Sequence, residues 1–310
     1  MVKSAQTLQQ ANLSNLEILI MAARPKTLPV SAVAIIVGTL LAVGEVSQIQ
    51  WITALFALIC AFAIQIGINL INDAIDFKKG ADTEERLGPQ RVTQAGLMSY
   101  QQVLTYGFAF FFFAFICGIP LMLAGGWPLF WALIASITFG YLYTGGPFPL
   151  AYLGLGEVFV LIFFGYVITF SAFYIQTKAI NSNCILAATQ LGLLAILPIA
   201  INNARDIKTD QSVNKKTLAV LFGLTFARWE ITILSILPYF IGIGWAIKGL
   251  PLMTVLPLLA FHGAYKNVRK IWQKPPGTIY NQYLARSAQN QLFFGLLLMT
   301  GYLVSIYFLD

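Results

Sequence analysis

Long apolar stretches recur along this chain, separated by short polar connections. A membrane-spanning helix needs about 20 mainly apolar residues to cross a hydrocarbon core roughly 30 Å thick. The pattern predicts nine such spans, at approximately 27–44, 51–72, 101–123, 127–144, 155–175, 184–204, 228–247, 251–265 and 290–308. A membrane β-barrel would need short segments of alternating polarity, whereas 30–42 and 291–308 are almost continuously apolar. The sequence therefore predicts an all-α integral membrane protein with a single domain over residues 1–310.

The composition supports a membrane location. Hydrophobic residues make up 58% of the chain and charged residues only 10%, and the mean hydropathy of +0.75 is well above that of a soluble domain. No cleavable signal peptide is evident, because polar residues interrupt the first 20 positions. Residues 1–22 are therefore expected to form a cytoplasmic N-terminal segment, with the first span kept as an anchor.

Basic residues divide unevenly between the two sides of this topology. Of the 19 Lys and Arg residues, all but Lys178 and Lys248 lie before the first span or after the second, sixth and eighth. Lys and Arg concentrate in cytoplasmic connections, so the N terminus and these loops are expected to be cytoplasmic, in the inner membrane. Contact with the lipid bilayer accounts for the net charge of +7, and no nucleic-acid partner is predicted.

Cysteine and histidine provide no evident site. Cys60, Cys117 and Cys184 lie in or beside separate apolar spans, without metal-ligand spacing, and are expected to be packing residues. His262 is the single histidine. Carboxylates are therefore the abundant hard ligands of this chain.

Two acidic motifs lie at equivalent places in the predicted topology. Asn72 and Asp76 end the second span, four residues apart, so they share one face if the helix continues. Asp206 and Asp210 follow the sixth span with the same spacing. Because four spans separate the two motifs, the chain is expected to contain a weak internal duplication, with two halves facing each other across a shared cavity.

Grouped carboxylates at a membrane boundary repel one another unless a cation is present. Mg²⁺ is the best candidate, since it prefers oxygen ligands and often completes its shell with substrate phosphate oxygens. A diphosphate bound between the motifs would supply those oxygens. The simpler interpretation is that these residues cap helix ends or balance nearby basic side chains. Two matching motifs, each flanked by basic residues, favour the metal site.

The chain resembles the UbiA superfamily of intramembrane aromatic prenyltransferases, and within it the MenA group, which prenylates 1,4-dihydroxy-2-naphthoate in menaquinone synthesis. The segments that carry the resemblance are 23–29, 88–97, 143–147, 203–206 and 216–220. The resemblance implies nine transmembrane helices around a central cavity. It also implies transfer of a polyprenyl group from polyprenyl diphosphate to the naphthoate, with loss of diphosphate and carbon dioxide, giving demethylmenaquinol.

The resemblance also implies a set of catalytic residues: Asn72, Asp73, Asp76, Asp206 and Asp210. All of these except Asp73, which would have a supporting role, are expected to bind metal, with two Mg²⁺ ions bridging the substrate diphosphate. The superfamily's third acidic position in the first motif is Gly80 here. The nearest acid, Asp82, is a possible further ligand.

Basic residues near the first motif are the candidates for substrate binding. Lys79, Arg86 and Arg91 are candidates for the diphosphate, although the positive charge of cytoplasmic loops explains them equally well. Arg24 and Lys26 are candidates for either the diphosphate or the acceptor carboxylate. Tyr143 is expected to line the isoprenoid path.

The sequence disfavours two other functions and leaves two open. Hydroxybenzoate enzymes commonly carry Lys four residues after a Tyr of the fourth-span loop, whereas Pro147 follows Tyr143 here, which disfavours that acceptor. Phytylation of a naphthoate and hydrolysis of the diphosphate stay open. An ion-coupled transporter is the non-enzyme alternative. It is disfavoured because the acids cluster on one face and not at the bilayer midplane.

Overall fold

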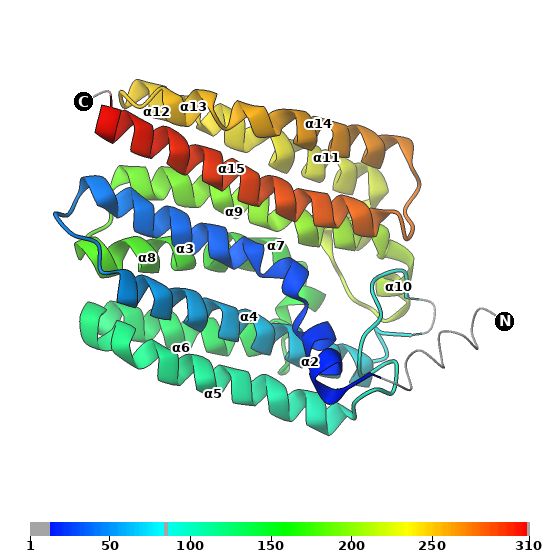
Figure 1. Ribbon diagram of the computed structural model, residues 1–310. Helices are drawn as coiled ribbons and strands as arrows, with labels where there is room; N and C mark the ends of the chain where they lie inside the picture. Colours follow the sequence, from blue (N-terminus) through cyan, green and yellow to red (C-terminus); the bar gives the residue numbers. More distant parts are fainter. Residues whose placement is uncertain (1–12, 84–85, 309–310) are drawn as a thin grey trace.

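The computed structural model describes residues 13–83 and 86–308, and within them it contains helices and no strand (Figure 1). Residues 1–12 of the predicted N-terminal segment, including Lys3, lie outside the described residues. The cytoplasmic location of 1–22 and the single domain over 1–310 stay predictions.

The described helices follow one another along the chain with short connections. They are α2 (Asn15–Ala23), α3 (Pro29–Leu41), α4 (Trp51–Lys78), α5 (Tyr100–Gly125), α6 (Trp127–Leu142), α7 (Gly156–Val160), the π-helical segment η4 (Leu161–Val167), α8 (Ile168–Thr177), α9 (Ser182–Arg205), α10 (Ile207–Ser212), α11 (Leu218–Ile241), α12 (Ile243–Ile247), α13 (Leu252–Val255), α14 (Leu258–Gln273) and α15 (Tyr280–Phe308). Short 3₁₀ turns are η1 (Pro25–Thr27), η2 (Ala42–Gly44) and η3 (Leu150–Tyr152).

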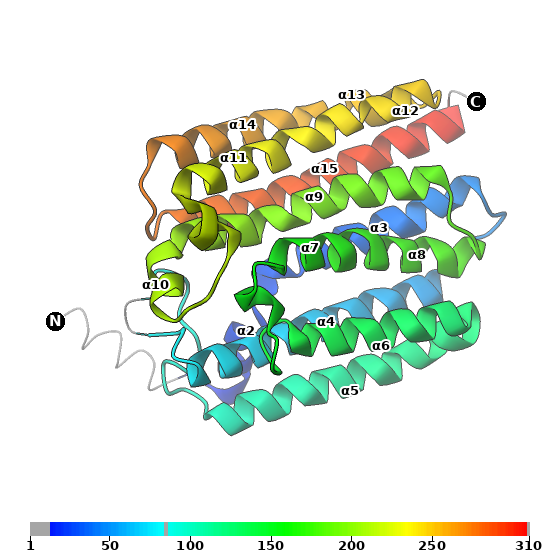
Figure 2. The ribbon, with the colours of Figure 1, turned by 180° about the vertical axis from the view of Figure 1, so that it is seen from behind.

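The long helices form one bundle in which α5 and α6 lie on one side and α11 and α14 on the other (Figures 1 and 2). Helix α9 runs through the interior, where Leu191 and Leu194 are fully buried. Gly165 of η4 meets Gly192 of α9 so closely that a Cβ on Gly165 would lie 2.7 Å from the Cα of Gly192. Small residues allow such close backbone approach between membrane helices.

Six described helices are long and apolar enough to cross a membrane, and the bent pair Asn15–Thr27 and Pro29–Gly44 makes seven if it forms one span. The protein is thus a multi-pass integral membrane protein, as predicted, but the count of about nine spans is not confirmed. Helix α6 lies at the predicted span 127–144 but has only 16 residues. Helices α13 and α14 lie at the predicted span 251–265, but α14 continues to Gln273 and carries Lys270 in its last turn.

The two acidic motifs lie at the same end of the bundle (Figure 1). Helix α4 continues from its predicted end at Asn72 through Asp76 to Lys78. It stops before Gly80, whose φ of +73° suits glycine at a helix C terminus. Helix α9 stops at Arg205. Asp206 is the N-cap of the short helix α10, which carries Asp210. The connection from α4 to α5 and helix α10 therefore close this end of the bundle together.

Candidate active site

A cavity of about 360 Å³ lies inside the bundle. Part of its wall is polar and comes from the end that carries the motifs, with Arg24, Asn72, Asp76, Arg91 and Lys215. Apolar side chains form much of the rest, including Ile35, Leu133, Phe139, Phe163 and Ile168. The cavity thus joins a charged end to an apolar interior.

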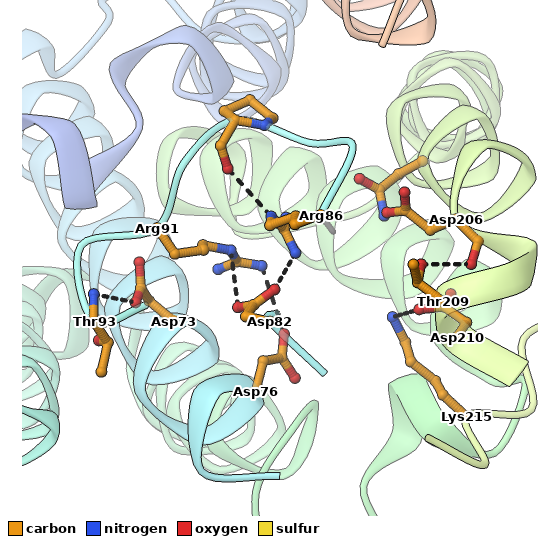
Figure 3. Close-up of polar contacts among 12 residues, drawn as sticks. Asp73, Asp76, Asp82, Arg86, Arg91, Thr93, Asp206, Thr209, Asp210 and Lys215 are labelled. Atoms are coloured by element: carbon orange, nitrogen blue, oxygen red, sulfur yellow. Dashed lines mark hydrogen bonds and ion pairs between the residues drawn. The ribbon is translucent and has the colours of Figure 1, made fainter. Parts of the chain in front are cut away.

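Asp76 is the aspartate of the first motif that lines this cavity, and it is buried. The hydroxyl of Tyr152 donates a hydrogen bond of 2.9 Å to Asp76 Oδ1. Arg91 Nη2 lies 3.5 Å from Asp76 Oδ2 (Figure 3). The carboxylate is therefore held from two sides by groups that lie outside its own helix.

Asp73, one turn earlier in α4, does not face the cavity in the same way. Its two carboxylate oxygens accept hydrogen bonds from the backbone N–H groups of Val92 and Thr93, at 3.2 and 3.1 Å. These bonds anchor the loop between α4 and α5 to α4. Arg91, next to Val92 in that loop, is thereby positioned beside Asp76.

Asp82 lies in the same loop and is 4% exposed. It accepts a hydrogen bond from Arg86, and its Oδ2 lies 3.3 Å from Arg91 Nε. Burial raises the pKa of the Asp82 carboxyl to about 6, against the opposing effect of the Arg86 charge. Arg91 therefore lies between two carboxylates, which orients its guanidinium toward the cavity end (Figure 3).

In the second motif each aspartate is paired with a basic side chain. Arg205 binds Asp206 through two bonds, Nε to Oδ1 at 2.7 Å and Nη2 to Oδ2 at 2.5 Å. Lys215 Nζ lies 3.2 Å from Asp210 Oδ1 (Figure 3). Burial raises the pKa of Asp210, while the charge of Lys215 opposes the shift. Both carboxylates are buried, and Lys215, the partner of Asp210, lines the cavity.

Two bridges connect the motifs. Arg205 bonds the side chain of Asn281, whose Nδ2 donates to the backbone oxygen of Leu87 at 2.9 Å. The neighbouring Gly88 lies so close that a Cβ there would be 2.8 Å from Arg205 Nη2. The loop of the first motif therefore rests on the second motif.

Tyr152 forms the other bridge. Besides its bond to Asp76, its ring lies under Lys79 Nζ at 4.4 Å from the centroid and under Lys215 Nζ at 5.7 Å. Cations interact favourably with aromatic faces at such distances. Tyr152 was not among the predicted residues. Its position in the irregular segment after Gly145-Gly146-Pro147 was the available signal, but the sequence does not indicate its partner.

The predicted site residues divide into two groups. Those that line the cavity are Arg24, Lys26, Asn72, Asp76, Arg86, Arg91 and Tyr143. Asp73, Lys79, Asp82, Asp206 and Asp210 are not among the described residues that line it. Lys79 Nζ instead donates to the backbone oxygen of Thr144 at 2.7 Å, and Asn72 Oδ1 accepts from the Thr144 hydroxyl at 2.7 Å.

Unsatisfied buried atoms indicate what this end of the cavity can bind. Within the described residues, Arg24 Nη2 and Arg91 Nη1 are buried donors without a hydrogen-bond acceptor, and Asp210 Oδ2 is a buried acceptor without a donor. Buried polar atoms usually have partners. The two arginine atoms fit an anion, and the carboxylate oxygen fits a cation.

The oxygen-rich donor set fits Mg²⁺, although not as a complete protein cage. Among the described residues, no group of three or more acidic, histidine or cysteine side chains is close enough to hold a metal. Mg²⁺ commonly binds through one or two carboxylates and takes its other ligands from water and substrate phosphates. The site would therefore need a phosphate-bearing substrate to complete metal coordination.

Comparison with known proteins decides the family. The UbiA prenyltransferase family matches residues 31–297, which is most of the chain. This chain belongs to the UbiA prenyltransferase family. The resemblance to the UbiA superfamily, predicted from the sequence motifs, is thereby confirmed.

Relatives of this UbiA-family chain carry more specific names. It is 32% identical over 291 residues to the 1,4-dihydroxy-2-naphthoate octaprenyltransferase of Bacillus subtilis (strain 168), covering 92% of this chain and 91% of that protein. It is 37% identical over 219 residues to the enzyme of the same name from Escherichia coli (strain K12), covering 66% and 68%.

A solved structure shares the fold of this UbiA-family protein. The structure of a UbiA homolog from Archaeoglobus fulgidus bound to DMAPP and Mg²⁺ superposes with a TM-score of 0.58 at 16% identity, covering 90% of this chain and 98% of that one. The predicted all-helical UbiA-like fold is thereby confirmed.

Proposed function

We propose that this protein transfers a polyprenyl group from polyprenyl diphosphate to 1,4-dihydroxy-2-naphthoate, with loss of diphosphate and carbon dioxide, giving demethylmenaquinol for menaquinone synthesis. The observation that carries the proposal is one cavity that joins a charged end to an apolar interior. The diphosphate belongs at the charged end and the prenyl chain in the apolar part. The names of the two similar bacterial enzymes support the naphthoate as acceptor.

The basic residues of the cavity would bind the diphosphate. Arg24 and Arg91 have buried donor atoms without acceptors, and guanidinium groups give strong, often bidentate hydrogen bonds to phosphate. Lys26 and Arg86 line the same cavity. Lys79 donates a hydrogen bond to the backbone oxygen of Thr144, a residue of the cavity wall. Together these cations offset the charge of the diphosphate while it is bound and as it leaves.

The acidic motifs would hold two Mg²⁺ ions, with Asn72 and Asp76 from the first motif and Asp206 and Asp210 from the second. Asp82 is a possible further ligand, and Asp73 keeps its supporting contact to the loop. Bound Mg²⁺ supplies positive charge that stabilises the departing diphosphate. Each motif carboxylate except Asp73 is paired with a basic side chain in the described structure, so metal binding would exchange some of these partners.

The apolar part of the cavity would protect the allylic cation that develops as the diphosphate leaves. Phe139 and Phe163 line it with ring centroids 5.7 Å apart, and Tyr143 lies nearer the motifs. Aromatic faces attract cations, and an apolar wall lowers the access of water that would capture the cation. The ring of the acceptor is then the available nucleophile.

The charge distribution supports a cytoplasmic active site in the inner membrane. The motif loops lie at one end of the bundle, and all but two of the 19 Lys and Arg residues fall on the predicted cytoplasmic face. Positive residues concentrate on the cytoplasmic side of membrane proteins. A water-soluble naphthoate would reach the site from the cytoplasm, and the prenyl substrate would reach it from the bilayer.

Purified protein in detergent, incubated with Mg²⁺ and radiolabelled polyprenyl diphosphate, tests the proposal. Parallel reactions contain 1,4-dihydroxy-2-naphthoate or 4-hydroxybenzoate, each with and without EDTA. We expect prenylated product with the naphthoate, abolished by EDTA. Product with the benzoate alone would keep prenyl transfer and overturn the acceptor, and no product with either would overturn the proposed function.

A further inference from the structure

Glu157 is an acidic residue of the cavity that neither motif contains. It lies at the start of α7, lines the cavity and is 5% exposed. Among the described residues that line the cavity, only Asp76 and Glu157 are acidic. An ionisable side chain inside a membrane bundle is costly and usually marks a functional site.

The partners of Glu157 differ from those of the motif aspartates. Its Oε1 accepts a hydrogen bond of 2.7 Å from Asn203 Nδ2. In the described part of the chain it forms no ion pair, whereas Asp76 has Arg91 within 3.5 Å. A carboxylate held by an amide keeps more of its basicity than one held by a guanidinium. Glu157 is thus the cavity acid that is free to accept a proton.

Glu157 lies where the polar wall of the cavity meets the apolar wall. Its partner Asn203 lies in α9, three residues before Asp206 of the second motif. Gly156, which precedes Glu157, is so close to Tyr143 that a Cβ there would be 3.0 Å from the Tyr143 hydroxyl. The residues that follow in the same wall are apolar, beginning with Phe159 and Val160. A diphosphate at the charged end would place the first prenyl carbon near this border.

We propose that Glu157 is the general base that accepts the hydroxyl proton of the aromatic acceptor. This inference rests on the proposed prenyl transfer and names a residue for its proton step. An aromatic ring becomes more nucleophilic as its hydroxyl loses a proton, and general bases commonly contribute about 10²- to 10⁴-fold to a rate. No histidine lines the cavity among the described residues, so this carboxylate takes that role.

The proton step accompanies formation of the new carbon–carbon bond. The ring carbon that carries the carboxylate bonds to the first prenyl carbon, while the prenyl C–O bond breaks and its electron pair leaves with the diphosphate. The acceptor O–H bond breaks, its proton passes to Glu157 and its electron pair forms a ring ketone. The carboxylate then leaves as carbon dioxide, the electrons of that bond restore the aromatic ring, and the oxygen recovers the proton from Glu157.

Glu157→Gln tests the proton step, because glutamine keeps the size and the oxygen that accepts from Asn203 but accepts no proton. We expect kcat at pH 7 to fall by about 100-fold or more, with the KM for polyprenyl diphosphate nearly unchanged. Glu45→Gln is the matched control. Glu45 also accepts a 2.7 Å bond from an asparagine, Asn181, but it is exposed and is not among the residues of the cavity.

The pH dependence separates a base from a structural contact. Phenolic hydroxyls ionise near pH 10, and an ionised acceptor needs no base, so the deficit of Glu157→Gln should shrink as the pH rises from 7 to 9.5 under anaerobic conditions. The titratable groups facing Glu157 from neighbouring elements are Tyr143, Lys215 and Glu230. Because each of these groups interacts with the charge of Glu157, the rates of wild type and variant are compared at every pH and not at a single value.

The possible results are distinct. Equal turnover by wild type and Glu157→Gln, or a deficit that stays the same at all pH values while the radiolabelled diphosphate binds normally, would overturn the role of Glu157. If wild type prenylates only 4-hydroxybenzoate, the naphthoate proposal fails and the same ratio is measured with the benzoate. If wild type prenylates neither acceptor, both proposals fail.

Discussion

The hydroxyl of Tyr152 donates a 2.9 Å hydrogen bond to Asp76 Oδ1, and so joins the segment after α6 to the first acidic motif. The same ring lies near Lys79, which follows the first motif, and Lys215, which pairs with Asp210 of the second. One side chain thereby positions groups from both motifs. We expect its removal to disturb metal and diphosphate binding together.

Replacing Tyr152 by phenylalanine removes the hydrogen bond and keeps the ring for the two lysines. A hydrogen bond to a charged group is worth about 1.5 kcal/mol or more, so we expect roughly tenfold weaker turnover at limiting Mg²⁺, with partial recovery at high Mg²⁺. Tyr152→Leu should lose more, since it also removes the ring. Titrations of initial rate against Mg²⁺ concentration measure both effects.

Tyr166→Phe is the matched control for this experiment. Tyr166 has a hydroxyl contact of comparable length, 3.0 Å to Thr189, but lies in η4 and is not among the described residues that line the cavity. Its Mg²⁺ dependence should equal that of wild type. An identical Mg²⁺ titration for Tyr152→Phe would show that the bond to Asp76 has no part in metal binding.

The two motifs should respond differently to loss of a carboxylate. Asp76→Asn and Asp206→Asn are both expected to abolish prenyl transfer. Asp206→Asn should also lower the unfolding temperature, because it leaves the fully buried Arg205 guanidinium without its ion pair, and breaking a buried pair costs about 3–5 kcal/mol. Initial rates and thermal unfolding in detergent separate the two effects. Measurable transfer by Asp76→Asn would contradict the metal assignment.

The sequence predicts the parts of the site that follow from local spacing. The interval between Asn72 and Asp76 predicts a shared helix face, and α4 does continue through both residues. The apolar pattern also predicts the helical membrane fold. The count of nine spans is not confirmed, because hydropathy does not reveal the length of a helix, and α6 has only 16 residues.

Contacts between distant segments could not be predicted in this way. Tyr152 is 76 residues from Asp76, and Glu157 is 46 residues from Asn203. Neither pair shares a periodic pattern or a motif. Their proximity depends on how α4, α7 and α9 pack, and it becomes visible only in three dimensions.

The contact between Gly88 and Arg205 gives a test of the bridge between the motifs. In Gly88→Ala the new methyl group would lie 2.8 Å from Arg205 Nη2, so the loop or the guanidinium must move. We expect a several-fold fall in kcat with little change in the amount of folded protein. Gly277→Ala is the control, since a Cβ at Gly277 meets no atom within 4 Å among the described residues. Equal rates for the two variants would mean that the bridge does not affect turnover.

Arg24 offers a test of which substrate group the cavity cations bind. Its guanidinium has a buried nitrogen without an acceptor, and its backbone adopts a left-handed φ of +54°, a conformation that is uncommon for residues other than glycine. If this nitrogen binds the diphosphate, Arg24→Gln should raise the KM for polyprenyl diphosphate by roughly 10-fold or more, because a charged hydrogen bond is lost. The KM for the naphthoate should change little.

Arg269→Gln serves as the control for Arg24→Gln, because Arg269 is exposed on α14 and is not among the described residues of the cavity. Arg269→Gln removes one positive charge, as Arg24→Gln does, but it does not change the lining of the cavity. Both KM values should therefore stay at their wild-type levels. Steady-state kinetics with each substrate varied in turn gives the comparison. A rise in the naphthoate KM alone for Arg24→Gln would assign Arg24 to the acceptor carboxylate, leaving Arg91 as the main guanidinium for the diphosphate.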